Sequence, residues 1–153
     1  MSYTADDLVI FEPLFDSSQR DGTAYFEFHP AELPEPNACW LSGSLLLRDA
    51  AFDFFAECFH RTKHSFDYFS FVRFGSRDIK RLIDELTIYI TTLNGGPTRQ
   101  QLFSNYASIF PEDIWAGVPT EPLADAVLNA GTILRRFVRS ETKESACLWV
   151  LGM

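Results

Sequence analysis

The fold of this chain is constrained most by the order in which its strand-like and helix-like sequence patterns follow one another. Residues 24–29 alternate between two faces with a period of two, which is typical of a half-buried strand. From Ser76 to Asn94, and again after Thr120, apolar residues recur at the three- and four-residue spacing of an amphipathic helix. Extended segments therefore come mainly first and helices mainly later, an order that favours an α+β fold.

Four further segments have extended patterns, at residues 8–15, 39–47, 66–74 and 146–151. The tight turn at Asp21-Gly22 predicts that the first two strands of the chain form a hairpin. The last segment is a six-residue apolar run, and we expect it to complete the sheet. Helices are predicted at residues 49–64, 76–94, 98–110 and from 120 to about 139.

These elements fit one domain over residues 1–153, with no linker and no internal repeat. We predict a mixed or antiparallel sheet of about five strands, with three to four helices packed mainly on one face. Ile88 falls off the apolar stripe of its helix. This position would allow Ile88 to contact a second layer of the fold or a partner.

Acidic residues are concentrated in the first two fifths of the chain. The formal net charge is −8, and residues 1–60 alone hold eleven acids against two bases. A nucleic-acid partner is not expected, because phosphate binding needs clustered Lys and Arg. The asymmetry instead favours association with a basic protein.

The chain also has features of a cytoplasmic protein. Its first fifteen residues lack the basic region of a signal peptide, and no apolar run approaches the length of a membrane span. The three cysteines, Cys39, Cys58 and Cys147, have neither disulfide-framework nor zinc-site spacing. We expect reduced thiols, no membrane and a cytoplasmic location.

No catalytic signature is present, and we predict that the chain is not an enzyme. The best constellation is Asp53, Glu57, His60 and His64, which would share one face of a helix at residues 49–64. Carboxylate and imidazole groups bind divalent metals. However, no second motif converges on this face, so a solvated face is the preferred interpretation and no metal or cofactor is predicted.

The chain has 23 aromatic residues, namely 15 Phe, 5 Tyr and 3 Trp. Most of the Phe positions follow helical or strand periodicity, so we assign them to the core. The alternative is that some of them line a pocket for a small molecule.

A non-catalytic protein-binding module that neutralises a basic partner is the preferred function. A small, acidic, cytoplasmic domain without catalytic residues is similar in general profile to the immunity proteins that bacteria make against their own toxins. This resemblance concerns the general profile only and assigns no functional role to any residue. The candidate contacts come from the Pro-rich loop at residues 30–37 and from the helix after it: Glu32, Glu35, Asp49, Asp53, Glu57 and His60.

Two alternatives remain. One is a small-molecule binding protein or weakly marked enzyme with an aromatic-lined pocket. The other is a structural subunit or homodimer, which the apolar C-terminal segment and Ile88 allow.

Overall fold

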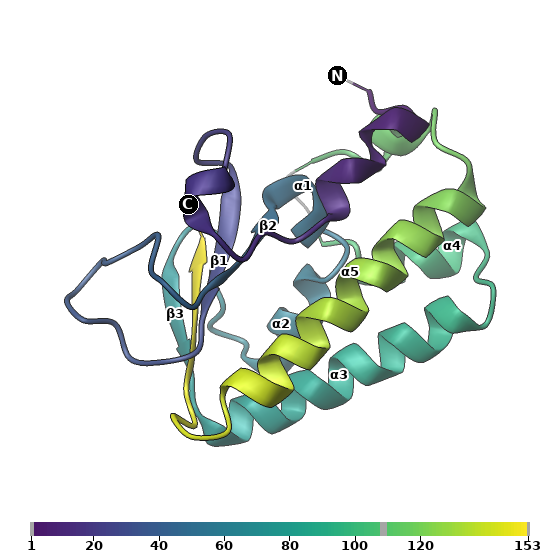
Figure 1. Ribbon diagram of the computed structural model, residues 1–153. Helices are drawn as coiled ribbons and strands as arrows, with labels where there is room; N and C mark the ends of the chain where they lie inside the picture. The colour runs from purple at the N-terminus through teal and green to yellow at the C-terminus, as the bar shows by residue number, and fades with distance from the viewer. Residues whose placement is uncertain (1, 108–109, 153) are drawn as a thin grey trace.

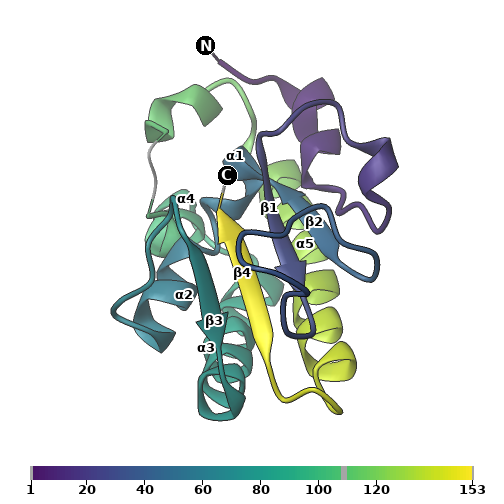
Figure 2. The same ribbon diagram turned by 90° about the vertical axis from the view of Figure 1, so that its left-hand side faces the viewer.

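A single antiparallel sheet with helices behind it forms the framework of the protein (Figures 1 and 2). The computed structural model describes residues 2–107 and 110–152. Over those residues the sheet has four strands in the order β2-β1-β4-β3, and every neighbouring pair is antiparallel. The α+β class is thereby confirmed, with one strand fewer than predicted. The strands are β1 (Tyr25–His29), β2 (Leu45–Arg48), β3 (Phe71–Phe74) and β4 (Leu148–Gly152).

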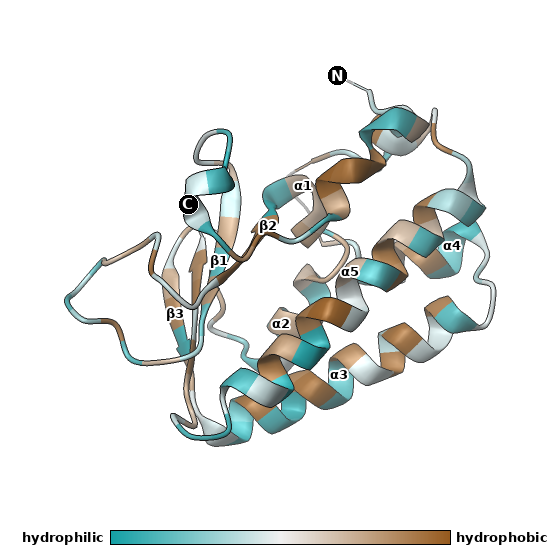
Figure 3. Cartoon of the chain, in the orientation of Figure 1, coloured by the Kyte–Doolittle hydropathy of each residue, from teal (hydrophilic) through white to brown (hydrophobic). Residues whose placement is uncertain are grey.

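Two long helices, α3 (Ser76–Asn94) and α5 (Thr120–Glu141), pack against each other on one side of the sheet. Each alternates hydrophobic and hydrophilic residues along its length (Figure 3), as the sequence pattern predicts. Ile88 of α3 is 62% exposed, in agreement with its place off the stripe. The shorter elements are η1 (Ala5–Phe11), η2 (Ser17–Gln19), α1 (Asp49–Phe52), α2 (Ala56–Thr62), α4 (Arg99–Leu102), η3 (Phe103–Asn105) and η4 (Glu112–Trp115).

The core between sheet and helices is built mainly from aromatic rings packed on one another. Phe26 of β1 stacks on Phe52 of α1 with ring centroids 3.9 Å apart, and Phe52 also contacts Phe59 of α2. Both phenylalanines of this first pair are fully buried. A truncation such as Phe52→Ala would cost about 3–5 kcal/mol. The assignment of most Phe residues to the core is confirmed.

The strand predicted at residues 8–15 is wrong. Residues Ala5–Phe11 form η1, a 3₁₀-helix, and only Leu14 pairs with the sheet, through a bridge to Leu46. The side chain of Asp7 accepts a hydrogen bond from the backbone N–H of Thr4, and this local cap favours a helical turn over an extended chain.

Two predicted strands are shorter than expected. In residues 39–47, Trp40 and Gly43 adopt φ of 56° and 86°, which breaks the extended chain before β2 begins at Leu45. In residues 66–74, the carboxylate of Asp67 accepts hydrogen bonds from Phe69 N–H and Ser70 Oγ. This turn confines β3 to Phe71–Phe74.

Two predicted helices are interrupted. Residues 49–64 form α1 and α2 with a turn between them, which allows Phe54 and Phe55 both to be fully buried. In residues 98–110, the helix covers only Arg99–Leu102, followed by η3; positions 108 and 109 lie outside the described residues.

The C-terminal strand joins the sheet as predicted, but it lies in the interior of the sheet between β1 and β3. It connects to β3 through α3 and α5, so the two strands of this pair are distant in sequence. An internal strand has no free edge for a partner.

Membrane spans were sought among the helices of the described residues. None of these helices has both the length and the apolar character needed to cross a bilayer.

Candidate functional site

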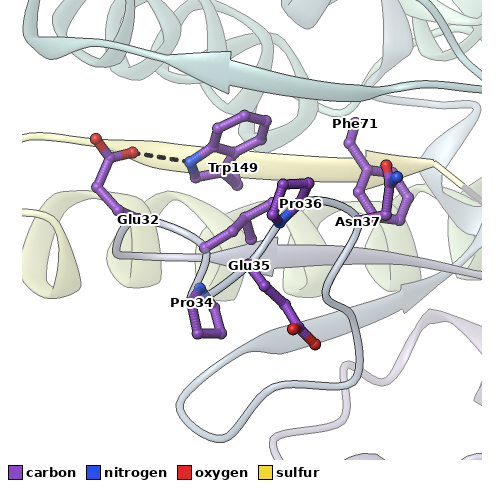
Figure 4. Close-up of a pocket in the computed structure, with 8 residues that line it drawn as sticks. Glu32, Pro34, Glu35, Pro36, Asn37, Phe71 and Trp149 are labelled. Atoms are coloured by element: carbon purple, nitrogen blue, oxygen red, sulfur yellow. Dashed lines mark hydrogen bonds between the residues drawn. The ribbon is translucent and has the colours of Figure 1, made fainter.

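The segment between β1 and β2, residues 30–44, crosses the face of the sheet that α3 and α5 leave uncovered (Figures 1 and 2). Where its proline-rich part rises from the sheet, it leaves a groove of about 590 Å³ (Figure 4). We call this the loop groove. Two sheet residues and six loop residues line it: Phe71, Trp149, Glu32, Leu33, Pro34, Glu35, Pro36 and Asn37.

A buried carboxylate fixes one end of this loop. Glu27 of β1 is 0% exposed and accepts hydrogen bonds from the backbone N–H groups of Trp40 (2.5 Å) and Leu41 (2.7 Å). It also accepts one from Ser44 Oγ at 2.7 Å. Three donors compensate for burying the charge, so Glu27 holds the returning half of the loop on the sheet.

The same network determines the proton position on His29. The hydroxyl of Ser44 has one proton, and the short contact to Glu27 uses it. His29 Nδ1, 2.9 Å from Ser44 Oγ, must therefore donate. Burial lowers the pKa of His29, while the negative charge of Glu27 opposes that shift.

Glu32 fixes the other end of the loop. It accepts hydrogen bonds from Arg73 Nε (2.9 Å), Trp149 Nε1 (2.9 Å, Figure 4) and Cys147 Sγ (3.3 Å). These donors, Arg73 first, lower the pKa of Glu32 to about 2. Ser145 Oγ adds a 2.5 Å hydrogen bond to the carbonyl of Pro30. Glu32 was predicted as a partner contact, and its carboxylate is engaged within the chain.

The part of the loop between these fixed ends is mostly exposed to solvent. Trp149 and Phe71 form an aromatic floor on the sheet, and Pro34 and Pro36 face solvent beside it. Glu35 is exposed, and its carboxylate points away from Trp149 (Figure 4). Its carboxylate forms no hydrogen bond or ion pair with any described residue, although its backbone carbonyl accepts from Ala38 N–H at 3.2 Å. The loop groove therefore combines an apolar centre with a charged rim.

Asp53 lies in the core, contrary to the prediction that it faces solvent on a helix. It is 0% exposed, and the hydroxyl of Tyr68 donates a hydrogen bond to its carboxylate. The turn after α1 directs it inward. Asp49, one helical turn earlier, is half-buried and accepts from the backbone N–H of Ala50. Burial raises the pKa of Asp49.

The remaining predicted contacts lie on α2 and do not line the loop groove. Glu57 pairs with Arg61 at 3.4 Å, and the half-buried ring of His60 meets Phe66 edge-on at 5.2 Å. His64 is exposed beyond the helix. The expected four-residue face is thus divided between core and surface. In the described part of the chain, no three His, Cys, Asp or Glu side chains are grouped to hold a metal.

The acidic surface is smaller than the charge of residues 1–60 implies. Glu27 and Asp53 are buried and do not face a partner. Several others are paired with bases: Asp21 with Arg48, Glu32 with Arg73, and Glu57 with Arg61. Within the predicted contact set, Glu35 is the carboxylate that combines full exposure with no partner among the described residues.

Sequence reasoning missed the sheet side of the groove. Phe71, Arg73 and Trp149 lie on the same face of neighbouring strands, with Arg73 directly opposite Trp149. The aromatic residues on both faces of residues 66–74 were the available signal, because such a pattern is more typical of a central strand covered on both sides. β3 is instead at the edge of the sheet.

Comparisons with protein-family models, with curated proteins and with solved structures each found no match for this chain.

Proposed function

We propose that this chain is a non-catalytic protein-binding module that engages a basic partner through the loop groove. In its most concrete form it is a cytoplasmic immunity- or inhibitor-type protein that neutralises a toxin domain. The observation that carries the proposal is the pairing of an apolar floor, Phe71 and Trp149, with the unpaired rim carboxylate of Glu35. Protein interfaces commonly have this arrangement of an apolar centre and a polar rim.

The rigidity of the loop supports the proposal. Glu27 and Glu32 fasten the loop on either side of its proline-rich segment, so little conformational entropy remains to be lost on binding. Pro34 and Pro36 further restrict the backbone of the rim.

The net charge of the chain also supports binding to a basic partner. The net charge of −8 attracts a cationic partner over a distance and raises the association rate. Arg73 lies opposite Trp149 of the groove floor, and its guanidinium is already paired with Glu32.

The cysteines support a non-catalytic role. Burial raises the pKa of Cys58 to about 12 and that of Cys147 to about 11. Both side chains stay as thiols at neutral pH, whereas cysteine nucleophiles react as thiolates.

A displayed library of random peptides, selected on the wild-type protein, tests the proposal. We expect selected peptides to combine an aromatic or large aliphatic residue with a nearby Lys or Arg. Phe71→Ala should weaken their binding at least tenfold, the equivalent of about 1.4 kcal/mol. Glu35→Lys should weaken it mainly at low salt, because rim charges act through the association rate.

Matched variants make the test specific. Phe69 is 66% exposed and does not line the groove, so Phe69→Ala controls for Phe71→Ala. Glu12→Lys changes charge as Glu35→Lys does, at an exposed position outside the groove. Equal losses in control and groove variants, or selection of peptides without basic residues, would overturn the proposal.

A further inference from the structure

A second cleft lies between the C-terminal end of α3 and the first turns of α5. Its volume is about 430 Å³. The side chains of Leu93, Pro97, Ala124 and Leu128 give it an apolar lining, and Glu121 and Asp125 add two carboxylates. We call it the helix-end cleft.

The two carboxylates of this cleft have no ion-pair partner among the described residues. Glu121 and Asp125 are four residues apart on α5, so they occupy the same face one turn apart. Both residues are exposed, and neither carboxylate forms a hydrogen bond or an ion pair with any residue that the structure describes. Like charges at this spacing are unfavourable, and a cation between them removes the repulsion.

Helix capping accounts for only one of these two acids. Glu121 lies in the first turn of α5, where the helix dipole favours a carboxylate. Asp125 lies one turn further along and gains little from the dipole. The end of α3 facing the cleft is a C-terminus, which carries partial negative charge. The partial positive charge at the N-terminus of α5 opposes that of the α3 end, so the two carboxylates are the main source of negative potential in the cleft.

Arg99, a base that contacts Thr120 at the edge of the cleft, has its donors directed to the segment before α5. Arg99 donates hydrogen bonds to Thr120 Oγ1 (3.1 Å) and to the carbonyl oxygens of Trp115 (2.6 Å) and Val118 (2.9 Å). These bonds hold the segment that leads into α5. Arg99 does not line the cleft.

We propose that the helix-end cleft receives a lysine side chain of the basic partner. The aliphatic stem would lie along Leu93 and Leu128, and the ammonium group would sit between Glu121 and Asp125. A lysine has this division into an apolar stem and a compact charged head. The inference rests on the proposed function, because it assumes a basic protein partner, but it concerns a separate surface.

Two further acidic segments, η1 and η4, lie beside each other outside the cleft. Tyr3 donates its backbone N–H to the carbonyl of Ile114 (2.7 Å) and stacks on Trp115. The N-terminal segment and η4 therefore lie side by side, and η1 also packs against α5 (Figure 1). These two segments carry the acids Asp6, Asp7, Glu112 and Asp113.

Chemical-shift perturbation with two small probes tests the inference without a partner. Nα-acetyl-lysine methylamide carries the stem and the ammonium, and Nα-acetyl-norleucine methylamide carries an aliphatic stem alone. We expect the lysine probe, at millimolar concentration, to shift the amide signals of Gly96, Glu121 and Asp125 selectively. The norleucine probe should shift them much less.

Charge-matched variants complete the experiment. The double variant Glu121→Gln/Asp125→Asn should weaken lysine-probe binding about fivefold, as expected for two exposed carboxylate–ammonium pairs. Glu112→Gln/Asp113→Asn removes the same charge from η4 and should weaken it less than twofold.

Equal shifts with the norleucine probe, or equal losses in the two double variants, would overturn the inference. The result is independent of the loop groove. Failure of the peptide selection with a positive lysine titration removes only the groove proposal, and the reverse outcome removes only the cleft.

Discussion

The carboxylate of Glu27 lies 2.5 Å from the backbone nitrogen of Trp40, a residue held at a φ of 56°. A bulky side chain rarely adopts this left-handed conformation. It persists here because two successive N–H groups, those of Trp40 and Leu41, converge on one buried anion. A strand residue thereby determines the path of a loop more than ten positions away.

The first prediction concerns this contact. Glu27→Gln keeps the size of the side chain but replaces one acceptor oxygen with an amide donor, facing groups that also donate. We expect a loss of about 2 kcal/mol in the free energy of unfolding, measured by urea denaturation. Amide exchange at Trp40 and Leu41 should accelerate. Glu35→Gln, at an exposed and unpaired position, should change stability by less than about 0.5 kcal/mol and serves as the control.

The second prediction is a pH dependence. Arg73 and its fellow donors lower the pKa of Glu32 from 4.5 to about 2 in the folded protein. A depressed pKa stabilises the fold above the unfolded value, and that contribution is lost as the pH falls from about 4.5 toward 2. Carbon-detected NMR should find the Glu32 carboxylate still ionised at pH 3.5. In Arg73→Leu its pKa should rise; an unchanged value would contradict the assigned cause.

The third prediction concerns the buried pair of Asp53 and Tyr68. Tyr68→Phe removes the hydroxyl that donates to the Asp53 carboxylate and leaves the ring in place. We expect a loss of about 1–3 kcal/mol in unfolding free energy, because a buried acceptor loses a donor. Tyr25→Phe, which removes a hydroxyl that donates to the exposed Asp21, should cost less than 1 kcal/mol. Equal losses would contradict the buried position of Asp53.

The fourth prediction concerns a close backbone approach. A Cβ at Gly152, at the end of β4, would collide with the carbonyl oxygen of Tyr68. Gly152→Ala should therefore destabilise the protein by about 1–3 kcal/mol, the usual cost of overpacking. At Gly95 the nearest atom lies 3.4 Å away and φ is −81°, so Gly95→Ala should be nearly neutral in thermal unfolding.

The fifth prediction orders the thiols by reactivity. Cys39 is half-exposed, whereas Cys58 and Cys147 are buried with strongly raised pKa values. Under native conditions a thiol reagent at pH 7.5 should modify Cys39 first, and the other two only on unfolding. Mass spectrometry of the peptides checks the order. Early modification of Cys58 would indicate an opening that this packing does not allow.

The long helices were the most predictable part of the fold. The stripe from Ile79 to Leu93 and the Gly95-Gly96 stop are local signals, and α3 follows them closely. The C-terminal strand was also predicted, because a short apolar run has few alternatives in a chain of this size. The predicted strands failed where an aspartate side chain accepts a hydrogen bond from a nearby backbone N–H. Asp7 does so in η1, and Asp67 does so in the turn before β3.

The candidate site was predictable only on its loop side. Three prolines and two glutamates mark residues 30–37 as an exposed loop, and Glu32 and Glu35 do line the groove. Nothing local distinguishes Glu35, which is unpaired, from Glu32, which is held by residues about 40 and 117 positions away. Charge at a given position does not indicate exposure, as the buried carboxylates of Glu27 and Asp53 demonstrate.

Fold class, the two long helices, the proline-rich loop and the total charge follow from the sequence alone, because periodicity, caps and composition are local properties. The tertiary fold sets where that charge is available. It buried Glu27 and Asp53 against donors from other elements, placed β4 between β1 and β3, and brought Trp149 beneath the loop. Such outcomes depend on pairings across long chain separations, which only the folded arrangement specifies.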